Sequence, residues 1–133
     1  MIEQIGTGNS RVTGALEKLM GMPGVLAGMV ATDEGLPLAA RLRAELDEEG
    51  LAAAAAVLGQ LGSKASSQIG ARSLELIVLD TSKLRFMVQP LAIGYLMVVT
   101  EPLTEADPVA AEMTSAVAHL NTVTAALAEP RAA

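Results

Sequence analysis

The side chains that most often carry catalysis are scarce in this chain. There is one histidine, His119, and no cysteine. A nucleophile needs a base beside it, but Ser115 and Val123 are the residues four positions from His119 in the predicted last helix. No acid lies at helical spacing from His119, so we interpret it as a solvated or boundary histidine.

Sequence motifs of known chemistry are also missing. The chain has no G-x-S-x-G, S-x-x-K or H-E-x-x-H, and no G-x-x-x-x-G-K-[ST] phosphate loop. Asp33 and Glu34 are adjacent acids in a predicted hairpin turn, where solvated turn residues are far commoner than metal ligands. We therefore expect no enzyme activity, no cofactor and no metal site.

The composition further restricts the kinds of partner that the chain could bind. A formal charge of −6 and an aromatic content of 2% disfavour nucleic acid, which needs a basic surface. No signal peptide is readable at the start, and the uncharged stretch 86–100 is broken by Gln89, Pro90 and Gly94, too short for a span of about 20 residues. With no cysteine, we expect a cytoplasmic protein without a membrane partner.

Hydrophobic spacing predicts the elements that would position any site. Helices are expected at 9–21, at 47–69 and from about 105 to 127, and strands at 25–32, 36–43, 73–80, 84–89 and 93–100. This order, α-β-β-α-β-β-β-α, predicts an α/β fold of the α+β sandwich kind, with one five-stranded antiparallel sheet flanked by helices. We expect a single domain over 1–133, with loose ends at 1–8 and 129–133.

Two features refine this prediction. Pro37 cannot donate a ladder hydrogen bond, so the strand 36–43 should lie at a sheet edge. The last helix should bury one apolar stripe, formed by Val109, Met113, Ala116, Leu120, Val123 and Leu127.

The alanine-rich helix 47–69 has two contrasting sides. On a helical wheel, the side expected to cover the sheet comprises Leu51, Ala54, Leu58, Leu61, Ala65 and Ile69. The opposite side is small and nearly uncharged, and comprises Ala52, Ala53, Ala56, Gly59, Gln60, Ser63, Lys64 and Ser67. Such a side lets another backbone approach closely, which favours an interface, although a helix that merely tolerates water would look the same.

The strand 73–80 alternates poorly after Glu75 and could be buried on both faces. As an exposed edge it would need a cap, and pairing with a second copy of itself would provide one. A central position in the sheet is the alternative.

Residues 24–39, GVLAGMVATDEGLPLA, resemble the first hairpin of Roadblock dynein light-chain domains, in which a glycine-containing strand leads to an acidic-Gly turn. The alanine-rich helix and the strand 94–99, GYLMVV, are similar to that family too, and the resemblance spans Leu16 to Leu127. The segment 104–108 departs from it, because many members have Asn-Leu-Gly before the last helix.

The resemblance implies a homodimer whose sheet continues across both subunits through the third strands, with the two copies of the second helix side by side. It also implies a scaffold or regulator of small Ras-like GTPases; gliding-motility members of the family accelerate GTP hydrolysis without inserting an arginine finger. Carried onto this chain, the partner-binding residues would be Gln60, Ser63, Lys64 and Ser67. The dimer interface would comprise Ala52, Ala56, Gly59, Leu74, Leu76 and Val78.

Three functions are consistent with these residues. A homodimer that binds a Ras-like GTPase and modulates its nucleotide cycle is the leading hypothesis. A passive assembly scaffold would bind without changing nucleotide turnover, and a small-ligand sensor of the PAS or GAF type would need an apolar pocket with a few polar groups. The shortage of polar residues in the strands argues against the sensor.

Overall fold

The computed structural model describes residues 6–43 and 45–128, and the side chains of 11–43 and 45–124. The helices are α1 (Gly6–Met20), α2 (Glu48–Gln68) and α3 (Ala106–Ala128). The strands are β1 (Val25–Thr32), β2 (Pro37–Leu42), β3 (Ile77–Asp80), β4 (Arg85–Leu91) and β5 (Gly94–Thr100). The predicted order of elements is confirmed.

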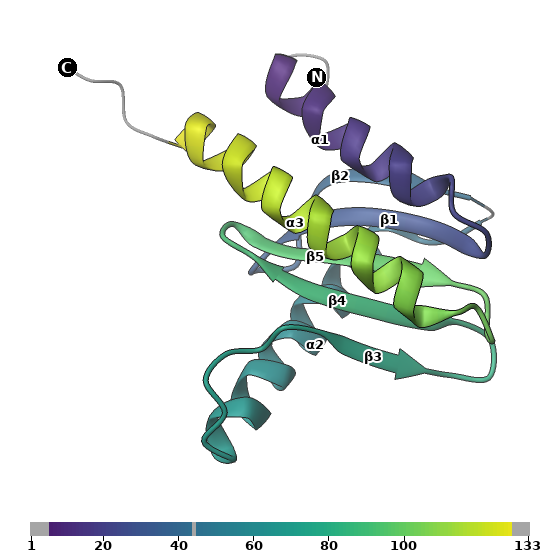
Figure 1. Ribbon diagram of the computed structural model, residues 1–133, viewed down its shortest axis with the longest axis vertical. Helices are drawn as coiled ribbons and strands as arrows, with labels where there is room; N and C mark the ends of the chain where they lie inside the picture. The colour runs from purple at the N-terminus through teal and green to yellow at the C-terminus, as the bar shows by residue number, and fades with distance from the viewer. Residues whose placement is uncertain (1–5, 44, 129–133) are drawn as a thin grey trace.

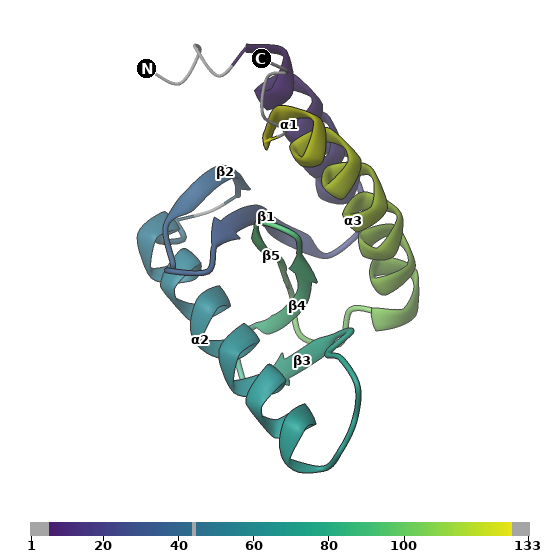
Figure 2. The ribbon, with the colours of Figure 1, turned by 90° about the vertical axis from the view of Figure 1, so that its left-hand side faces the viewer.

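All neighbouring strands pair antiparallel, in the order β2-β1-β5-β4-β3. Helix α2 covers one face of the sheet, and α1 and α3 lie side by side on the other (Figure 1, Figure 2). The expected position of the strand that begins with Pro37 is confirmed, because β2 forms one edge of the sheet.

The centre of the sheet explains why its strands read as continuous apolar runs. In β5, Leu96 and Val98 join the core under α1 and α3, whereas Tyr95, Met97 and Val99 join the core under α2. Because successive side chains of a strand point to opposite faces, a strand covered on both faces must be apolar throughout.

The last helix buries the apolar stripe that was predicted for it. Val109, Met113, Ala116, Leu120 and Val123 are buried against the sheet and α1. The side chain of Leu127 lies outside the described residues.

The third strand differs from its prediction in length and burial. Only Ile77–Asp80 is extended and paired, and Val78, Leu79 and Asp80 are exposed, so burial on both faces was wrong for the single chain. Continuing the β3–β4 register by two residues would set Glu75 opposite Pro90, which has no N–H to donate. The position of β3 at the second edge also excludes a central strand.

Smaller differences occur at element ends. Pro90 and Leu91 belong to β4 and pair with Tyr95 and Gly94, whereas we expected them in a turn. Gly6–Gly8 form the start of α1, so the expected loose end does not extend to residue 8. Glycines disfavour a helix by local propensity alone, and tertiary context often overrides that preference. The rest of the expected loose ends, 1–5 and 129–133, lies outside the described residues.

Candidate interaction surface on the second helix and the edge strand

Small residues form the side of α2 that faces its own sheet. The buried residues of this helix are Leu51, Ala52, Ala55, Ala56 and Gly59. Gly59 lies directly against the ring of Tyr95, and an added Cβ there would overlap the ring. These residues therefore let the helix approach β1, β4 and β5 closely, where Met29, Met97 and Tyr95 fill the space.

The wheel assignment of α2 was therefore wrong in part: Leu51, Ala54 and Leu58 pack on the sheet side as expected, but the helix is rotated so that residues expected outside also face the sheet. Ala52, Ala56 and Gly59 are covered by the chain's own sheet, so they are not available for the dimer interface expected of them. Leu61, Ala65 and Ile69, expected to cover the sheet, are exposed instead. The helix has rotated by roughly a quarter turn or more from its expected orientation, given about 100° per residue.

The outward side of α2 carries an apolar row that we call the outer stripe. Its members recur every fourth residue and are Ala53, Val57, Leu61, Ala65 and Ile69. The exposed fractions are 59% for Val57, 61% for Leu61 and 81% for Ile69. Exposed Val57, Leu61 and Ile69 opposite a buried side made mostly of small residues are unusual for a surface helix, and a helix-long apolar stripe marks a contact surface.

The polar residues expected to bind a partner flank this stripe. Gln60, Ser63, Lys64 and Ser67 are all exposed. The side-chain amide of Gln60 donates a hydrogen bond of 2.9 Å to the carbonyl oxygen of Asp33 in the β1–β2 turn. Gln60 thus fixes the turn to the helix, and Gly35 of the same turn lies against Ala53.

Strand β3 lies beside the second half of this helix. Gly62 of α2 faces the side chains of Ile77 and Leu74, with no room for a Cβ. The last turns of α2 extend past β3 in both ribbon views (Figure 1, Figure 2). From Ser63 onward the helix is exposed except at half-buried Ser66, so no part of the described chain covers its end.

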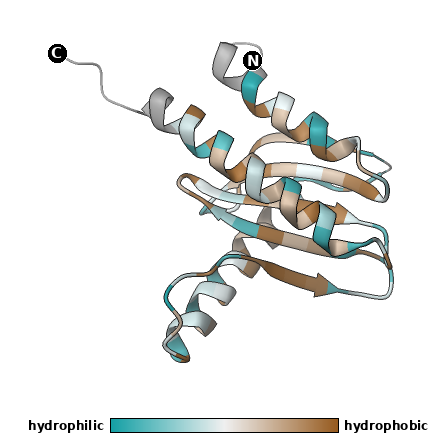
Figure 3. Cartoon of the chain, viewed as in Figure 1, coloured by the Kyte–Doolittle hydropathy of each residue, from teal (hydrophilic) through white to brown (hydrophobic). Residues whose placement is uncertain are grey.

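The free edge of β3 is apolar. Val78 and Leu79 are 42% and 40% exposed, and Figure 3 shows the strand coloured hydrophobic along most of its length. Leu74 and Leu76 are half-buried, Leu74 against α2 and Leu76 against the core under α3. The structure therefore places Val78 on the surface and Leu74 and Leu76 partly inside the chain.

Two groups of this region have shifted pKa values. Arg85 Nε contacts Asp80 Oδ1 at 2.5 Å where β3 turns into β4. The hydrogen bond to Asp80 raises the pKa of Arg85, against the opposing effect of burial. Burial and the nearby charge of Asp33 raise the pKa of Tyr95, so its hydroxyl stays neutral under α2.

The residues considered for chemistry do not come together. His119 is exposed on α3, and Asp33 and Glu34 are exposed in the β1–β2 turn. Among the described residues no group of three or more His, Cys, Asp or Glu could hold a metal ion. Within the same residues, no helix combines the length and apolar character that crossing a bilayer requires.

The outer stripe was missed, although its signal was present in the sequence. The four-residue recurrence of Ala53, Val57, Leu61, Ala65 and Ile69 is visible there, but Ala53 was assigned to the outer side, the last three to the sheet side and Val57 to neither. What identifies it as a surface is the burial of the neighbouring alanines.

Comparisons with known proteins support one family. The Roadblock/LC7 domain model matches residues 13–101. A Roadblock/LC7 domain from Streptomyces avermitilis superposes with a TM-score of 0.76 at 18% identity, covering 84% of this chain and 95% of that one. No curated protein matches the chain.

Two gliding proteins are also similar in structure. MglB from Thermus thermophilus has a TM-score of 0.79 at 15% identity, covering 89% of this chain and 91% of its own. Myxococcus xanthus MglB has a TM-score of 0.81 at 13% identity, covering 93% and 95%. At these identities the structures establish the fold, and the match over 13–101 establishes the family: the chain belongs to the Roadblock/LC7 domain family.

Proposed function

We propose that this protein is a cytoplasmic homodimer that binds a small Ras-like GTPase and modulates its nucleotide cycle through contacts, without catalysis of its own. The observation that carries the proposal is the outer stripe of α2, which runs uncovered past the free edge of β3. Membership of the Roadblock/LC7 family supports the class of partner.

Two uncovered features that lie at one place, the edge of β3 and the end of α2, support the proposed dimer. An edge strand presents unpaired N–H and C=O groups, and two β3 strands related by a twofold axis can satisfy each other. The overhanging end of α2 lies beside that edge, so the same operation brings two outer stripes together. Burying a Val, Leu or Ile side chain stabilises such a contact by about 1.5–3 kcal/mol.

The polar residues beside the outer stripe of α2 are suited to contact the GTPase. Ser63, Lys64 and Ser67 remain exposed beside the stripe, and Lys64 is the cation among them. A lysine at the rim of an interface attracts a carboxylate of the partner and steers association more than it adds affinity. A pair of α2 helices would double this surface.

Regulation without catalysis requires differential contacts. A bound dimer changes hydrolysis or exchange only if it contacts one nucleotide state or transition state better than another. The surface of α2 offers contacts, and within the described residues no group of three or more His, Cys, Asp or Glu could hold a metal ion. A passive scaffold would bind with both rates unchanged, and the assay below separates the two.

A ligand sensor is less well supported. Both faces of the sheet are packed by helices, with the core under α2 filled by Met29, Tyr95 and Met97. The hollows of the described chain open at its surface. A sensor of the PAS or GAF type would instead enclose its ligand.

The test measures binding and turnover with one charge-reversed variant. Ras-like GTPases retained from the cell of origin by the immobilised protein are purified and assayed for GTP hydrolysis and for release of fluorescent GDP. We expect one rate to change on adding the dimer, and Lys64→Glu to weaken binding about tenfold or more without altering the melting temperature, since Lys64 is exposed. The matched control is Lys83→Glu, an exposed lysine in the β3–β4 turn.

Three results would contradict the proposal. Sedimentation of the protein as a monomer at micromolar concentration would remove the dimer. Binding with unchanged rates would leave a scaffold, and a large fall in melting temperature for Lys64→Glu would make that lysine structural.

A further inference from the structure

The turn between β5 and α3 displays a strained apolar residue. Leu103 has φ of 71° and is 94% exposed, the highest fraction among the exposed large hydrophobic side chains described. The amide of Thr104 donates to the Glu101 carbonyl at 3.3 Å, closing a four-residue turn with Pro102 second and Leu103 third. That third position with positive φ normally takes glycine. A bulky residue there is an outlier whose cost needs a reason.

Neighbouring contacts hold this turn in place. Arg85 Nη1 donates to the carbonyl oxygen of Thr104 at 2.5 Å, and the amide of Glu101 donates to the carbonyl of Gly24 at 2.9 Å. The side chain of Thr104 occupies the space in which a Cβ of Gly24 would lie. The exposure of Leu103 is therefore a fixed property of the turn.

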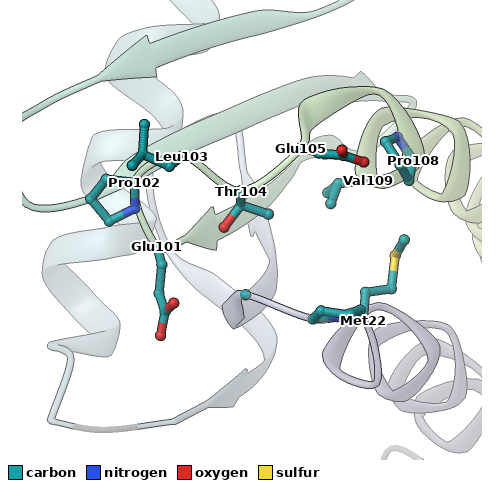
Figure 4. A pocket seen from close by; sticks show the side chains of 10 residues that line it. Met22, Glu101, Pro102, Leu103, Thr104, Glu105, Pro108 and Val109 are labelled. Carbon is teal, nitrogen blue, oxygen red and sulfur yellow. The ribbon is translucent and has the colours of Figure 1, made fainter.

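Beside the turn lies an open pocket of about 400 Å³ between the end of α1 and the start of α3 (Figure 4). Met22, Pro108 and Val109 lie together at one end, Pro102 and Leu103 at the other, and Thr104 between them. Three prolines, at 23, 102 and 108, are among its lining residues. Proline fixes the backbone dihedral φ, so the walls are preorganised and an occupant pays little to order them.

The charged residues that line the pocket are both acidic. Glu101 and Glu105 line it on either side of Thr104, and both are exposed. No lysine, arginine or histidine is among the lining residues. An apolar pocket lined by two carboxylates and no cation complements an apolar side chain that has a cation next to it.

We propose that this pocket docks a short segment of a partner protein in which an apolar side chain adjoins Lys or Arg. The apolar side chain packs between Met22 at one end of the pocket and Leu103 at the other, and the cation lies between the two glutamates. The pocket is formed by the ends of α1 and α3, on the face of the sheet opposite α2. This second partner can therefore bind while the outer stripe is occupied.

One substitution separates docking from folding. Leu103→Gly removes the displayed side chain and places at positive φ the residue that the turn favours, so the fold should be retained. Glu101→Lys combined with Glu105→Lys reverses the charge. The matched controls are Leu38→Ala, another exposed leucine, and Glu34→Lys, another exposed glutamate, both in the β1–β2 hairpin region.

The probe is a phage-displayed library of random 12-residue peptides, selected on the full chain. We expect enriched peptides in which Lys or Arg lies within two positions of Leu, Ile, Met or Phe. The synthetic form of the best peptide should bind Leu103→Gly and the double charge reversal at least about tenfold more weakly than the parent by fluorescence anisotropy. The two controls should bind as the parent does.

Several outcomes would overturn the proposal. They are enrichment of acidic or uncharged peptides only, binding that is unchanged in Leu103→Gly, and failure to enrich any peptide that distinguishes the parent from that variant. Circular dichroism melting of each variant checks the fold. Leu103→Gly should keep the sedimentation behaviour and GTPase effect of the parent, so failure here is distinguishable from failure of the proposed function.

Discussion

Gly59 shows how one missing side chain sets the position of a helix. Its α carbon faces the ring of Tyr95, and the nearest atoms to an added Cβ are three atoms of that ring. The ring itself is buried between α2 and β5. Neither group can move without displacing the helix from the sheet.

We therefore expect Gly59→Ala to destabilise the protein by about 1–3 kcal/mol, the usual cost of overpacking a core. Urea denaturation followed by circular dichroism measures it. Gly14→Ala is the matched control, because Gly14 is also helical but has nothing within 4 Å of an added Cβ. That control should stabilise the protein by about 0.5–1 kcal/mol through helix propensity. Equal effects of the two substitutions would contradict the close approach of α2.

The ionisation of Tyr95 should make the stability of the folded protein depend on pH. Its pKa is raised by burial and by Asp33, so the folded state holds the phenolic proton more tightly than the unfolded state. The contribution of the neutral form is fully present below the unfolded pKa of about 10 and is lost as pH rises through the higher folded pKa.

The expected result is a fall in unfolding free energy above about pH 10 that is smaller in Tyr95→Phe, which has no proton to lose. Denaturation curves of the two proteins at matched pH isolate Tyr95 from the lysines, which titrate in both. Parallel pH profiles would show that Tyr95 ionises equally easily in both states.

At the scale of elements, α2 and β3 form the proposed interface. The buried residues of α2 are small apart from Leu51, namely Ala52, Ala55, Ala56 and Gly59, whereas Val57, Leu61 and Ile69 are exposed. Beside it, β3 is only four residues long and has one free edge. In the described chain, α2 thus leaves apolar side chains uncovered and β3 leaves one strand edge unpaired.

Leu61→Asp tests the outer stripe. A carboxylate at an apolar contact loses hydration without gaining a partner, so the dimer dissociation constant should rise at least about tenfold. Sedimentation equilibrium measures it, and far-ultraviolet circular dichroism should be unchanged because Leu61 is exposed. Leu103→Asp, an exposed leucine away from α2, should leave the dimer intact. A dimer equally stable in Leu61→Asp would exclude the stripe from the interface.

The whole molecule has two opposite faces. The sheet separates α2 from α1 and α3, so the proposed dimer and GTPase surface lies on one face and the Leu103 pocket belongs to the other (Figure 2). Such an arrangement allows two partners to bind the same chain without competing for one site.

The order of elements and much of the topology could be predicted from the sequence by itself. Pro37 indicated an edge strand, and Val109, Met113 and Leu120 form the buried stripe expected of α3. These features are local, because periodicity and the absence of an N–H act through the chain's own backbone.

Only the tertiary structure decided which side of α2 meets the sheet. An alanine-rich helix has little contrast between its sides, and its orientation depends on the bulk of Tyr95, Met29 and Met97, which are distant in sequence. The short β3 likewise depends on Pro90 in the opposing strand. The expected dimer residues Ala52, Ala56 and Gly59 failed for that reason, whereas Gln60, Ser63, Lys64 and Ser67 are exposed. Side-chain volume across the sheet sets the rotation of the helix, and that information is not local.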